Sequence, residues 1–218
     1  MKNNESNDTP IATDWSQLYQ YRRATQKRYP SIWHVPLRKR HHQVVRQETP
    51  ALDSLLELGA GARNLQDELK KTYSEFDYKS FDIDRQRFHD FYSLEEINGE
   101  YQVACMFEVI EHVTPTIALN TLQTAFRHVK PGGKIFVTTP NIYYPPEYLR
   151  DATHITPWCY DELGGIVQMA GFELDKIYRL HQDPLLTKIL RRYLTRPLFQ
   201  LLGLDFAKQI IAVGKKPA

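Results

Sequence analysis

The amino-acid sequence predicts a doubly wound α/β fold built on a Rossmann-like, mostly parallel β-sheet. Beyond Pro50, short apolar segments alternate with amphipathic ones, which is the pattern of strands and helices that follow one another along a parallel sheet. The first apolar segment ends in a loop that carries two glycines, Gly59 and Gly61. Residues 101–107 are almost continuously apolar, which is typical of a strand that is covered on both faces.

Strands are expected where a short apolar run is bounded by polar or turn residues. The runs that fit this description are residues 54–58, 78–83, 101–107, 134–139, 172–178 and 209–213. Residues 64–71 are expected to form a helix directly after the glycine loop. Apolar side chains at helical spacing predict a second helix between Ile117 and Val129, which ends at the turn Lys130-Pro131-Gly132-Gly133. A third helix is expected over residues 160–170, before Gly171.

The chain is expected to form a single domain over residues 14–218, preceded by a polar, disordered tail at residues 1–13. Residues 14–48 mix aromatic and basic side chains and are expected to form helices that roof the active site. The cofactor-binding core is expected at residues 51–180. A helical insertion at residues 183–204 then precedes the last strand, at residues 209–214.

Composition places the protein among ordinary globular chains. Its 218 residues suffice for one hydrophobic core, and 42% of them are hydrophobic. The only cysteines, Cys105 and Cys159, give neither a disulfide framework nor metal-ligand spacing, so no metal site is expected. The N-terminal residues lack the apolar stretch of a signal peptide, and no segment approaches the roughly 20 apolar residues of a membrane span. We therefore expect a cytoplasmic protein that is at most peripheral at the inner membrane surface.

The glycine loop is the most informative segment of the sequence. Without a Cβ atom at Gly59 or Gly61, the backbone there can approach a ligand closely. Glu57, two residues earlier, would repel the pyrophosphate of a dinucleotide but suits a ligand with an ammonium group and a sulfonium centre. Asp82, near the end of the second expected strand, can accept hydrogen bonds from both hydroxyls of a ribose. The alternative is that both carboxylates are simply solvated at strand ends.

Five motifs in one collinear order resemble those of class I S-adenosylmethionine-dependent methyltransferases, and most closely the O-methyltransferase branch of ubiquinone biosynthesis. They are Glu57-Leu58-Gly59-Ala60-Gly61, Phe81-Asp82-Ile83-Asp84, Cys105-Met106-Phe107-Glu108-Val109-Ile110-Glu111-His112-Val113, the segment from His128 to Asn141, and the set His154, Trp158, Glu162-Leu163 and Ala170-Gly171-Phe172. The resemblance spans roughly residues 36–178. It implies a seven-stranded sheet whose last strand is antiparallel, and S-adenosylmethionine as the cofactor.

The resemblance also implies a role for each cofactor-binding residue. The implied set is Glu57, Gly59, Ala60 and Gly61 at the methionine end, Asp82 and Ile83 at the ribose, Asp90 and Phe91 at the adenine, with Phe107, and Arg38 at the cofactor carboxylate. Two of these have a plainer alternative: Asp90 as a turn residue, and Arg38 as one of a solvated basic run.

Two positions depart from the family pattern. Arg63 stands where the family usually has a third glycine, and it either crowds the loop or reaches the methionine carboxylate. Gln102 stands where the family has an aspartate, and it is expected to make only structural contacts.

The expected reaction is methyl transfer to a small-molecule, glycan or lipid-linked acceptor, with oxygen as the favoured acceptor atom. An oxygen acceptor benefits from a base whose pKa lies near the working pH, which favours histidine. His112 and His154 follow strands whose ends lie at the ligand-binding edge of an open α/β sheet, and Glu108 and Asn141 are similarly placed to orient the acceptor. The alternative is that either histidine caps a helix or stabilises a loop.

The partner interpretation rests on residues 184–202. Leucines recur there at helical spacing among basic residues, which are Lys188, Arg191, Arg192 and Arg196. We interpret this segment as a lid or homodimer helix, and a basic amphipathic helix lying on an anionic membrane is the alternative. The net charge of +2 and the lack of a recognisable RNA module give no strong nucleic-acid signal.

Two other functions compete with methyl transfer. A nicotinamide-dependent dehydrogenase would use a similar sheet, but Glu57 and the missing Gly-x-Gly-x-x-Gly pattern argue against it. A catalytically inactive cofactor-binding module would keep the fold without turnover, and Arg63 is the best argument for it.

Overall fold

The computed structural model of this chain describes residues 15–181 and 194–218. The strands are β1 (Leu37–Arg38), β2 (Ser54–Leu58), β3 (Asp77–Phe81), β4 (Tyr101–Phe107), β5 (Val129–Pro140), β6 (Glu173–Leu180) and β7 (Gln209–Lys215). The α-helices are α1 (Trp15–Arg28), α2 (His41–Glu48), α3 (Asn64–Lys70), α4 (Pro115–His128), α5 (Pro145–Leu149), α6 (Tyr160–Met169) and α8 (Arg196–Leu201). Short 3-10 helices, η2 (Ile32–His34) and η3 (Ile110–His112), lie between them.

The strands form one seven-stranded sheet in the order β1-β6-β7-β5-β4-β2-β3. β2 pairs in parallel with both β3 and β4, and β4 pairs in parallel with β5. β7 is antiparallel to both of its neighbours, β5 and β6. The predicted fold class is therefore confirmed, including the antiparallel last strand.

β1 was not predicted, because it lies in a segment for which the sequence predicted only helices. Leu37 and Arg38 pair in parallel with Arg179 and Leu180 and extend the β6 edge of the sheet. The backbone continues this pairing on both sides, because Arg179 N–H donates to Pro36 O and His181 N–H donates to Arg38 O. A two-residue strand has no periodicity of its own, so the sequence alone did not reveal it.

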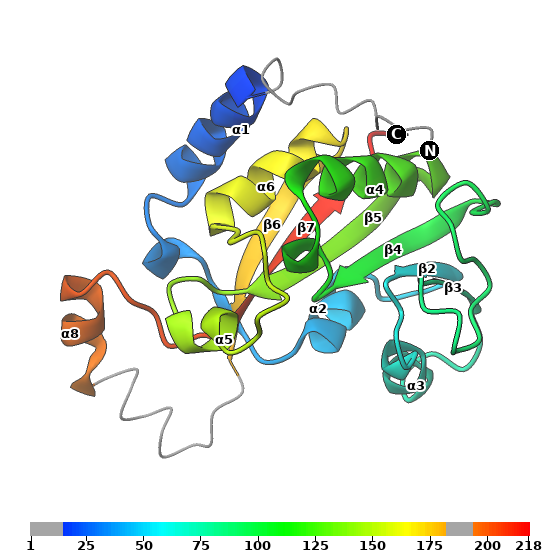
Figure 1. Ribbon diagram of the computed structural model, residues 1–218, viewed down its shortest axis with the longest axis horizontal. Coiled ribbons are helices and arrows are strands. Elements are labelled where there is room, and N and C mark those ends of the chain that lie inside the picture. The colour runs from blue at the N-terminus through cyan, green and yellow to red at the C-terminus, as the bar shows by residue number, and fades with distance from the viewer. Residues whose placement is uncertain (1–14, 182–193) are drawn as a thin grey trace, which may run out of the picture.

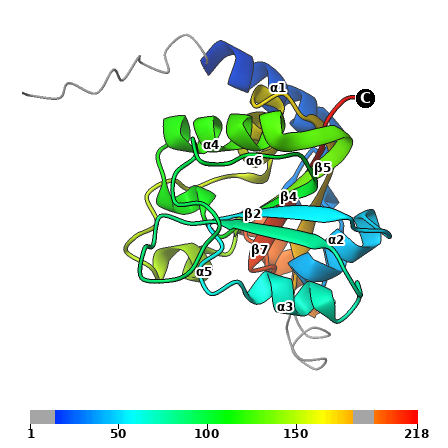
Figure 2. The same ribbon diagram turned by 90° about the vertical axis from the view of Figure 1, so that its right-hand side faces the viewer.

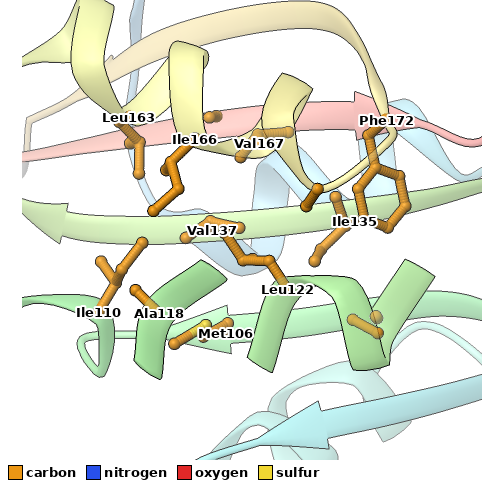
Figure 3. Close-up of a cluster of buried hydrophobic side chains, with 14 of the residues drawn as sticks. Met106, Ile110, Ala118, Leu122, Ile135, Val137, Leu163, Ile166, Val167 and Phe172 are labelled. Carbon is orange, nitrogen blue, oxygen red and sulfur yellow. The ribbon is translucent and has the colours of Figure 1, made fainter. Parts of the chain in front are cut away.

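Helices cover both faces of the sheet, and the two hydrophobic cores lie between the layers. In Figure 2, α4 and α6 lie above the sheet with α1 beyond them, and α2 and α3 lie below it. Figure 3 shows the upper core, in which residues of α4 and α6 meet residues of β4 and β5. Alternate residues of β2 contribute to the two cores: Leu56 and Leu58 face α4, and Leu55 faces α2 and α3.

α1 does not lie over the carboxyl edge of the sheet, where a roof was expected, and α2 reaches that edge with its first residue, His41, whose ring contacts Phe107 at the end of β4. α1 packs on the outer side of α6, where Arg22 and Gln26 both bond Asp161 of α6 at 3.1 and 2.8 Å. α2 packs flat on the opposite face, where Val44 and Val45 are buried in the lower core. This segment therefore completes the outer layers of the fold.

One boundary differs from the sequence prediction because of a pairing that is distant in sequence. β5 begins at Val129, so the glycine turn expected before the strand is included in it. Gly132 N–H donates to Lys216 O, and Lys216 N–H donates to Gly133 O, which attaches the turn to the end of β7. The register with β4 shifts between Tyr101 and Val103 to accommodate the extra residues.

Residues 184–193 of the segment 184–202 lie outside the described residues, as does the whole tail at residues 1–13. The described end of the segment includes α8, and the exposed leucines there are Leu194, Leu198, Leu201 and Leu202. The lid-or-dimer and membrane interpretations of this segment both stay predictions. None of the helices in the described part of the chain is long and apolar enough to span a bilayer.

Leu122 provides a test of the upper core. Its side chain on α4 is fully buried, so Leu122→Ala should lower the free energy of unfolding by about 2–5 kcal/mol. Ile117→Ala is the matched control on the same helix, because Ile117 is 50% exposed, and it should change stability by no more than about 0.5 kcal/mol. Urea denaturation of both variants measures the difference. Equal effects would mean that α4 does not pack as described.

Candidate active site

The carboxyl ends of the parallel strands bring the predicted site residues to one edge of the sheet. The glycine loop follows β2, Asp82 follows β3, and Glu108 follows β4. These three strands are adjacent in the sheet, so their end loops form one continuous surface. Open α/β sheets bind ligands at this edge.

The glycine loop is shaped by close contact with the segment after β4. Gly59 has φ 73°, and a Cβ atom there would lie 2.2 Å from a methyl carbon of Val109. Gly61 has φ 48°, and its N–H donates to the Asp82 carboxylate at 2.8 Å. Only glycine fits at position 59, and the loop is held against the two neighbouring strand ends.

Glu57 is the second-last residue of β2, two positions before Gly59. Its side chain is buried, and it accepts a hydrogen bond from the hydroxyl of Tyr78 on β3. Burial raises the pKa of Glu57 to about 7, although the Tyr78 hydroxyl and the Arg63 guanidinium act in the opposite direction. A buried acid of this kind is stabilised in its ionised form when a cation binds next to it.

Asp82 occupies the position expected of a ribose-binding acid. One carboxylate oxygen accepts from Gly61 N–H, and the other accepts from Asp84 N–H at 2.9 Å. The side chain is half-buried, and each oxygen keeps a further lone pair for a ligand hydroxyl. Ala60 is buried in the loop, while Ile83 is 80% exposed next to Asp82.

The predicted adenine pair is less accessible than the sequence suggested. Asp90 already accepts hydrogen bonds from the backbone and hydroxyl of Ser80 and pairs with Lys79 at 3.2 Å. Phe91 is buried in the upper core, and its backbone bridges to Phe81. Phe107, at the end of β4, lies against the ring of His41 with centroids 4.7 Å apart. The structure thus gives Asp90 and Phe91 local structural contacts.

Arg38 is not brought to the glycine loop. It lies in β1 at the far edge of the sheet, and four strands separate β1 from β2. Its guanidinium bonds Gln47 at 3.0 Å and lies 4.7 Å from the ring centroid of Tyr178. The short match to the family motif predicted that Arg38 would lie at the cofactor carboxylate. The pairing of β1 with β6 holds it elsewhere.

A second group of titratable side chains lies next to the glycine loop, after β4. Glu108 adopts φ 54°, a left-handed conformation that is uncommon outside glycine. Its carboxylate accepts from the Thr138 hydroxyl on β5 at 2.7 Å. Glu111 is fully buried, and neither of its carboxylate oxygens has a hydrogen-bond partner in the described part of the chain. Burial, together with the nearby Glu108 carboxyl, raises the pKa of Glu111 to about 8.

His112 and His154 meet beside Glu111, as their predicted placement at this edge required. Backbone N–H groups of Ile155 and Thr156 donate to Glu111 O and fix the segment that carries His154. The centroids of the two imidazole rings are 4.7 Å apart.

The hydrogen bonds of the two histidines assign their tautomers. His154 Nδ1 lies 2.7 Å from Tyr148 O, and a carbonyl only accepts, so Nδ1 carries the proton. The Thr153 hydroxyl donates to Asp151, so it accepts from His112 Nδ1 at 2.9 Å. In the neutral form, each imidazole therefore offers the lone pair of Nε2 to a proton or a metal ion.

Glu111 is the site residue that the sequence analysis missed. Ligand atoms of Glu111, His112 and His154 all lie within 4.8 Å of one another, which is compact enough to hold a divalent cation. The sequence predicted no metal site, because its two cysteines lack metal-ligand spacing. The available signal was the position of Glu111 and His112, which lie three and four residues after Glu108 and follow the strand expected at residues 101–107.

Asn141 does not orient an acceptor in this structure. It is fully buried, and its side-chain NH₂ donates to Asp205 and to Ala207 O, both at 2.9 Å. Its side-chain oxygen accepts from Tyr143 N–H. Asn141 therefore anchors the segment that leads into β7.

Comparisons with known proteins agree with this geometry. The family model of the methyltransferase domain matches residues 20–177, so the chain belongs to the methyltransferase domain family. A solved S-adenosylmethionine-dependent methyltransferase from Archaeoglobus fulgidus superposes with a TM-score of 0.62 at 16% identity, covering 80% of this chain and 92% of that chain. One from Clostridium acetobutylicum gives a TM-score of 0.57 at 8% identity, covering 96% and 100%.

At these identities the structural likeness shows the shared fold. No curated protein matches the sequence significantly. S-adenosylmethionine is the expected cofactor of a chain with this domain and this fold. The buried acid, a loop glycine that admits no Cβ at position 59 and the acid at the end of β3 fit that cofactor.

Asp82 provides a direct test of cofactor placement. Asp82→Ala should weaken binding of S-adenosylhomocysteine by about 1.5–3 kcal/mol, because hydrogen bonds between a charged group and the ribose are lost. Asp84→Ala is the matched control, since the Asp84 side chain points to Arg87 at 3.7 Å, and it should change affinity less than about twofold. Titration calorimetry measures both. If the two variants bind equally well, Asp82 is not on the ribose.

Glu57 predicts a pH dependence of cofactor binding. Its pKa of about 7 means that it becomes ionised, and attracts an ammonium group, as the pH rises from 6 to 8. Affinity for S-adenosylhomocysteine should therefore increase about tenfold over this range in the wild type and stay nearly flat in Glu57→Gln. Calorimetry at pH 6, 7 and 8 tests this, and parallel pH profiles for the two proteins would exclude Glu57 as the source.

The raised pKa of Glu57 also affects the stability of the fold, which should fall with rising pH while cofactor affinity increases. The folded-state pKa of Glu57 lies above its ordinary value of 4.5, so the folded cofactor-free protein binds more protons than the unfolded chain between these values. Stability should fall as the pH rises from about 4.5 through 7, and Glu57→Gln should reduce that loss.

Proposed function

We propose that this protein transfers the methyl group of S-adenosylmethionine to a hydroxyl oxygen of a small-molecule, glycan or lipid-linked acceptor. The observation that carries the proposal is the group formed by buried Glu111 and half-buried Glu108, His112 and His154, which lies directly beside the glycine loop. Val109, between the two glutamates, is the residue that contacts Gly59. The glycine loop and the titratable group are therefore neighbours. In-line methyl transfer requires the cofactor and the acceptor to be held next to each other in this way.

The residues divide the work by position. Glu57, the glycine loop and Asp82 would hold the cofactor. The cofactor would supply the methyl group from its sulfonium sulfur, and the sulfur would remain as the thioether of S-adenosylhomocysteine. His112 and His154 present Nε2 lone pairs that can take the hydroxyl proton of the acceptor. Glu108 is fixed by Thr138 and would orient the acceptor.

The unpartnered carboxylate of Glu111 supports a refinement. Buried carboxylates without a hydrogen-bond partner are costly, and a divalent cation held by Glu111, His112 and His154 would remove that cost. Such a cation would lower the pKa of a bound hydroxyl group and assist its deprotonation. The refinement leaves the methyl-transfer proposal unchanged.

The first experiment is a screen of metabolite and lipid extracts with methyl-labelled cofactor, which identifies the acceptor. His112→Gln and His154→Gln are then compared for kcat, acceptor KM and cofactor Kd. Losing a base or a metal ligand should reduce kcat at least about a hundredfold in one variant, with cofactor Kd nearly unchanged. Near wild-type kcat in both variants would show that transfer proceeds by positioning alone.

Metal titration separates the two modes of deprotonation. Calorimetry with Zn²⁺, Mn²⁺ and Mg²⁺ should detect one site in the wild type if a cation is used, and Glu111→Gln should abolish it. Activity that survives chelation, with no metal binding, assigns the step to an imidazole. Cofactor binding without transfer to any acceptor would favour the inactive binding module.

A further inference from the structure

Arg63 occupies the last position of the glycine loop in a conformation that favours glycine. Its φ is 59° and its ψ is 25°, and its N–H donates to Ala60 O at 2.7 Å to close the loop turn. An L side chain in this region costs free energy that glycine avoids. A strained, charged residue at the edge of a ligand loop points to a role for its side chain.

The guanidinium of Arg63 lies on the same tyrosine that bonds Glu57. It is 5.0 Å from the ring centroid of Tyr78 and 5.4 Å from that of Phe88, and the Tyr78 hydroxyl donates to the Glu57 carboxylate. One aromatic ring therefore separates a buried acid from a guanidinium. A basic and an acidic side chain therefore both contact Tyr78 next to the glycine loop.

The positive charge of Arg63 acts on the pKa of Glu57 but is not held in an ion pair within the described part of the chain. No acidic side chain there forms an ion pair with it, whereas nearby Lys79 pairs with Asp90 and Arg87 pairs with Asp84. Stacking on Tyr78 and Phe88 orients the guanidinium without neutralising it. Arg38, the arginine expected at the cofactor carboxylate, lies at the far edge of the sheet.

We propose that Arg63 and Glu57 together recognise the zwitterionic amino-acid end of the cofactor, with Arg63 binding its carboxylate and Glu57 its ammonium group. The two cofactor groups share one carbon atom, so their recognition needs opposite charges a few ångströms apart. The planar guanidinium suits a carboxylate. This inference rests on the cofactor assignment of the proposed function, and it gives Arg63 a specificity role that glycine cannot fill.

The test measures three ligands that differ only at the amino-acid end: S-adenosylhomocysteine, its decarboxylated analogue, and 5′-methylthioadenosine, which lacks both charged groups. Arg63→Gly should weaken S-adenosylhomocysteine about 10–100-fold, because a charge-assisted pair is lost. Affinity for the two ligands without a carboxylate should change less than about twofold. Arg63→Gly should remain folded, because glycine adopts φ 59° freely.

Two further variants sharpen the result. Arg85→Ala is the matched control, since Arg85 stacks on Tyr92 in the neighbouring loop and should affect none of the ligands. Glu57→Gln should weaken both ligands that carry the ammonium group and spare 5′-methylthioadenosine. Circular dichroism and thermal melts verify that each variant is folded.

Two outcomes measured on Arg63→Gly overturn the inference alone. One is an Arg63→Gly variant that binds S-adenosylhomocysteine as tightly as the wild type. The other is an equal loss for all three ligands, which would make Arg63 a residue that shapes the loop. Wild-type protein that binds none of the ligands overturns the inference together with the cofactor assignment. Selective loss of S-adenosylhomocysteine binding in a protein with no methyl transfer would uphold the inference while the proposed function fails.

Discussion

The contact between Gly59 and Val109 is the constraint on which the site depends. A Cβ atom at position 59 would lie 2.2 Å from the valine methyl, so the loop after β2 and the loop after β4 can approach this closely only with glycine. Val109 belongs to the segment that carries Glu108, Glu111 and His112. The packing that shapes the cofactor loop therefore also positions the acid–histidine group. Because β2 and β4 are adjacent parallel strands, the register of the sheet fixes the geometry of both halves.

Much of the fold could be predicted because its signals are local. β2 and β4 have the predicted bounds, since each is a run of apolar residues buried on both faces. The parts that could not be predicted depend on contacts distant in sequence. β1 exists because two residues pair with β6, some 140 positions away, and β5 extends through its glycine turn because Lys216 bonds it. No periodicity within either segment carries that information.

The site shows the same division between local and distant information. The placement of His112 and His154 together followed from strand ends sharing an edge, whereas the contact of His154 with Glu111 depends on backbone bonds from Ile155 and Thr156. Arg38 matched a family motif locally, yet its strand pairing takes it to the opposite edge of the sheet. Arg63 departs from the motif, yet its guanidinium contacts Tyr78, the residue that donates a hydrogen bond to Glu57. A motif therefore predicts a residue type more reliably than it predicts where the side chain goes.

Two buried carboxyl groups give the site its electrostatic character. Burial raises the pKa of Glu57 to about 7 and that of Glu111 to about 8, so both acids are poorly stabilised as anions in the cofactor-free protein. Each becomes a more favourable anion when further positive charge arrives beside it. The ligand expected at the first is a cation, with an ammonium group and a sulfonium centre, whereas a dinucleotide would bring a pyrophosphate to the same loop. Cofactor binding at this position would offset the cost of burying Glu57, and the same acid that destabilises the empty fold would favour a cationic cofactor over a dinucleotide.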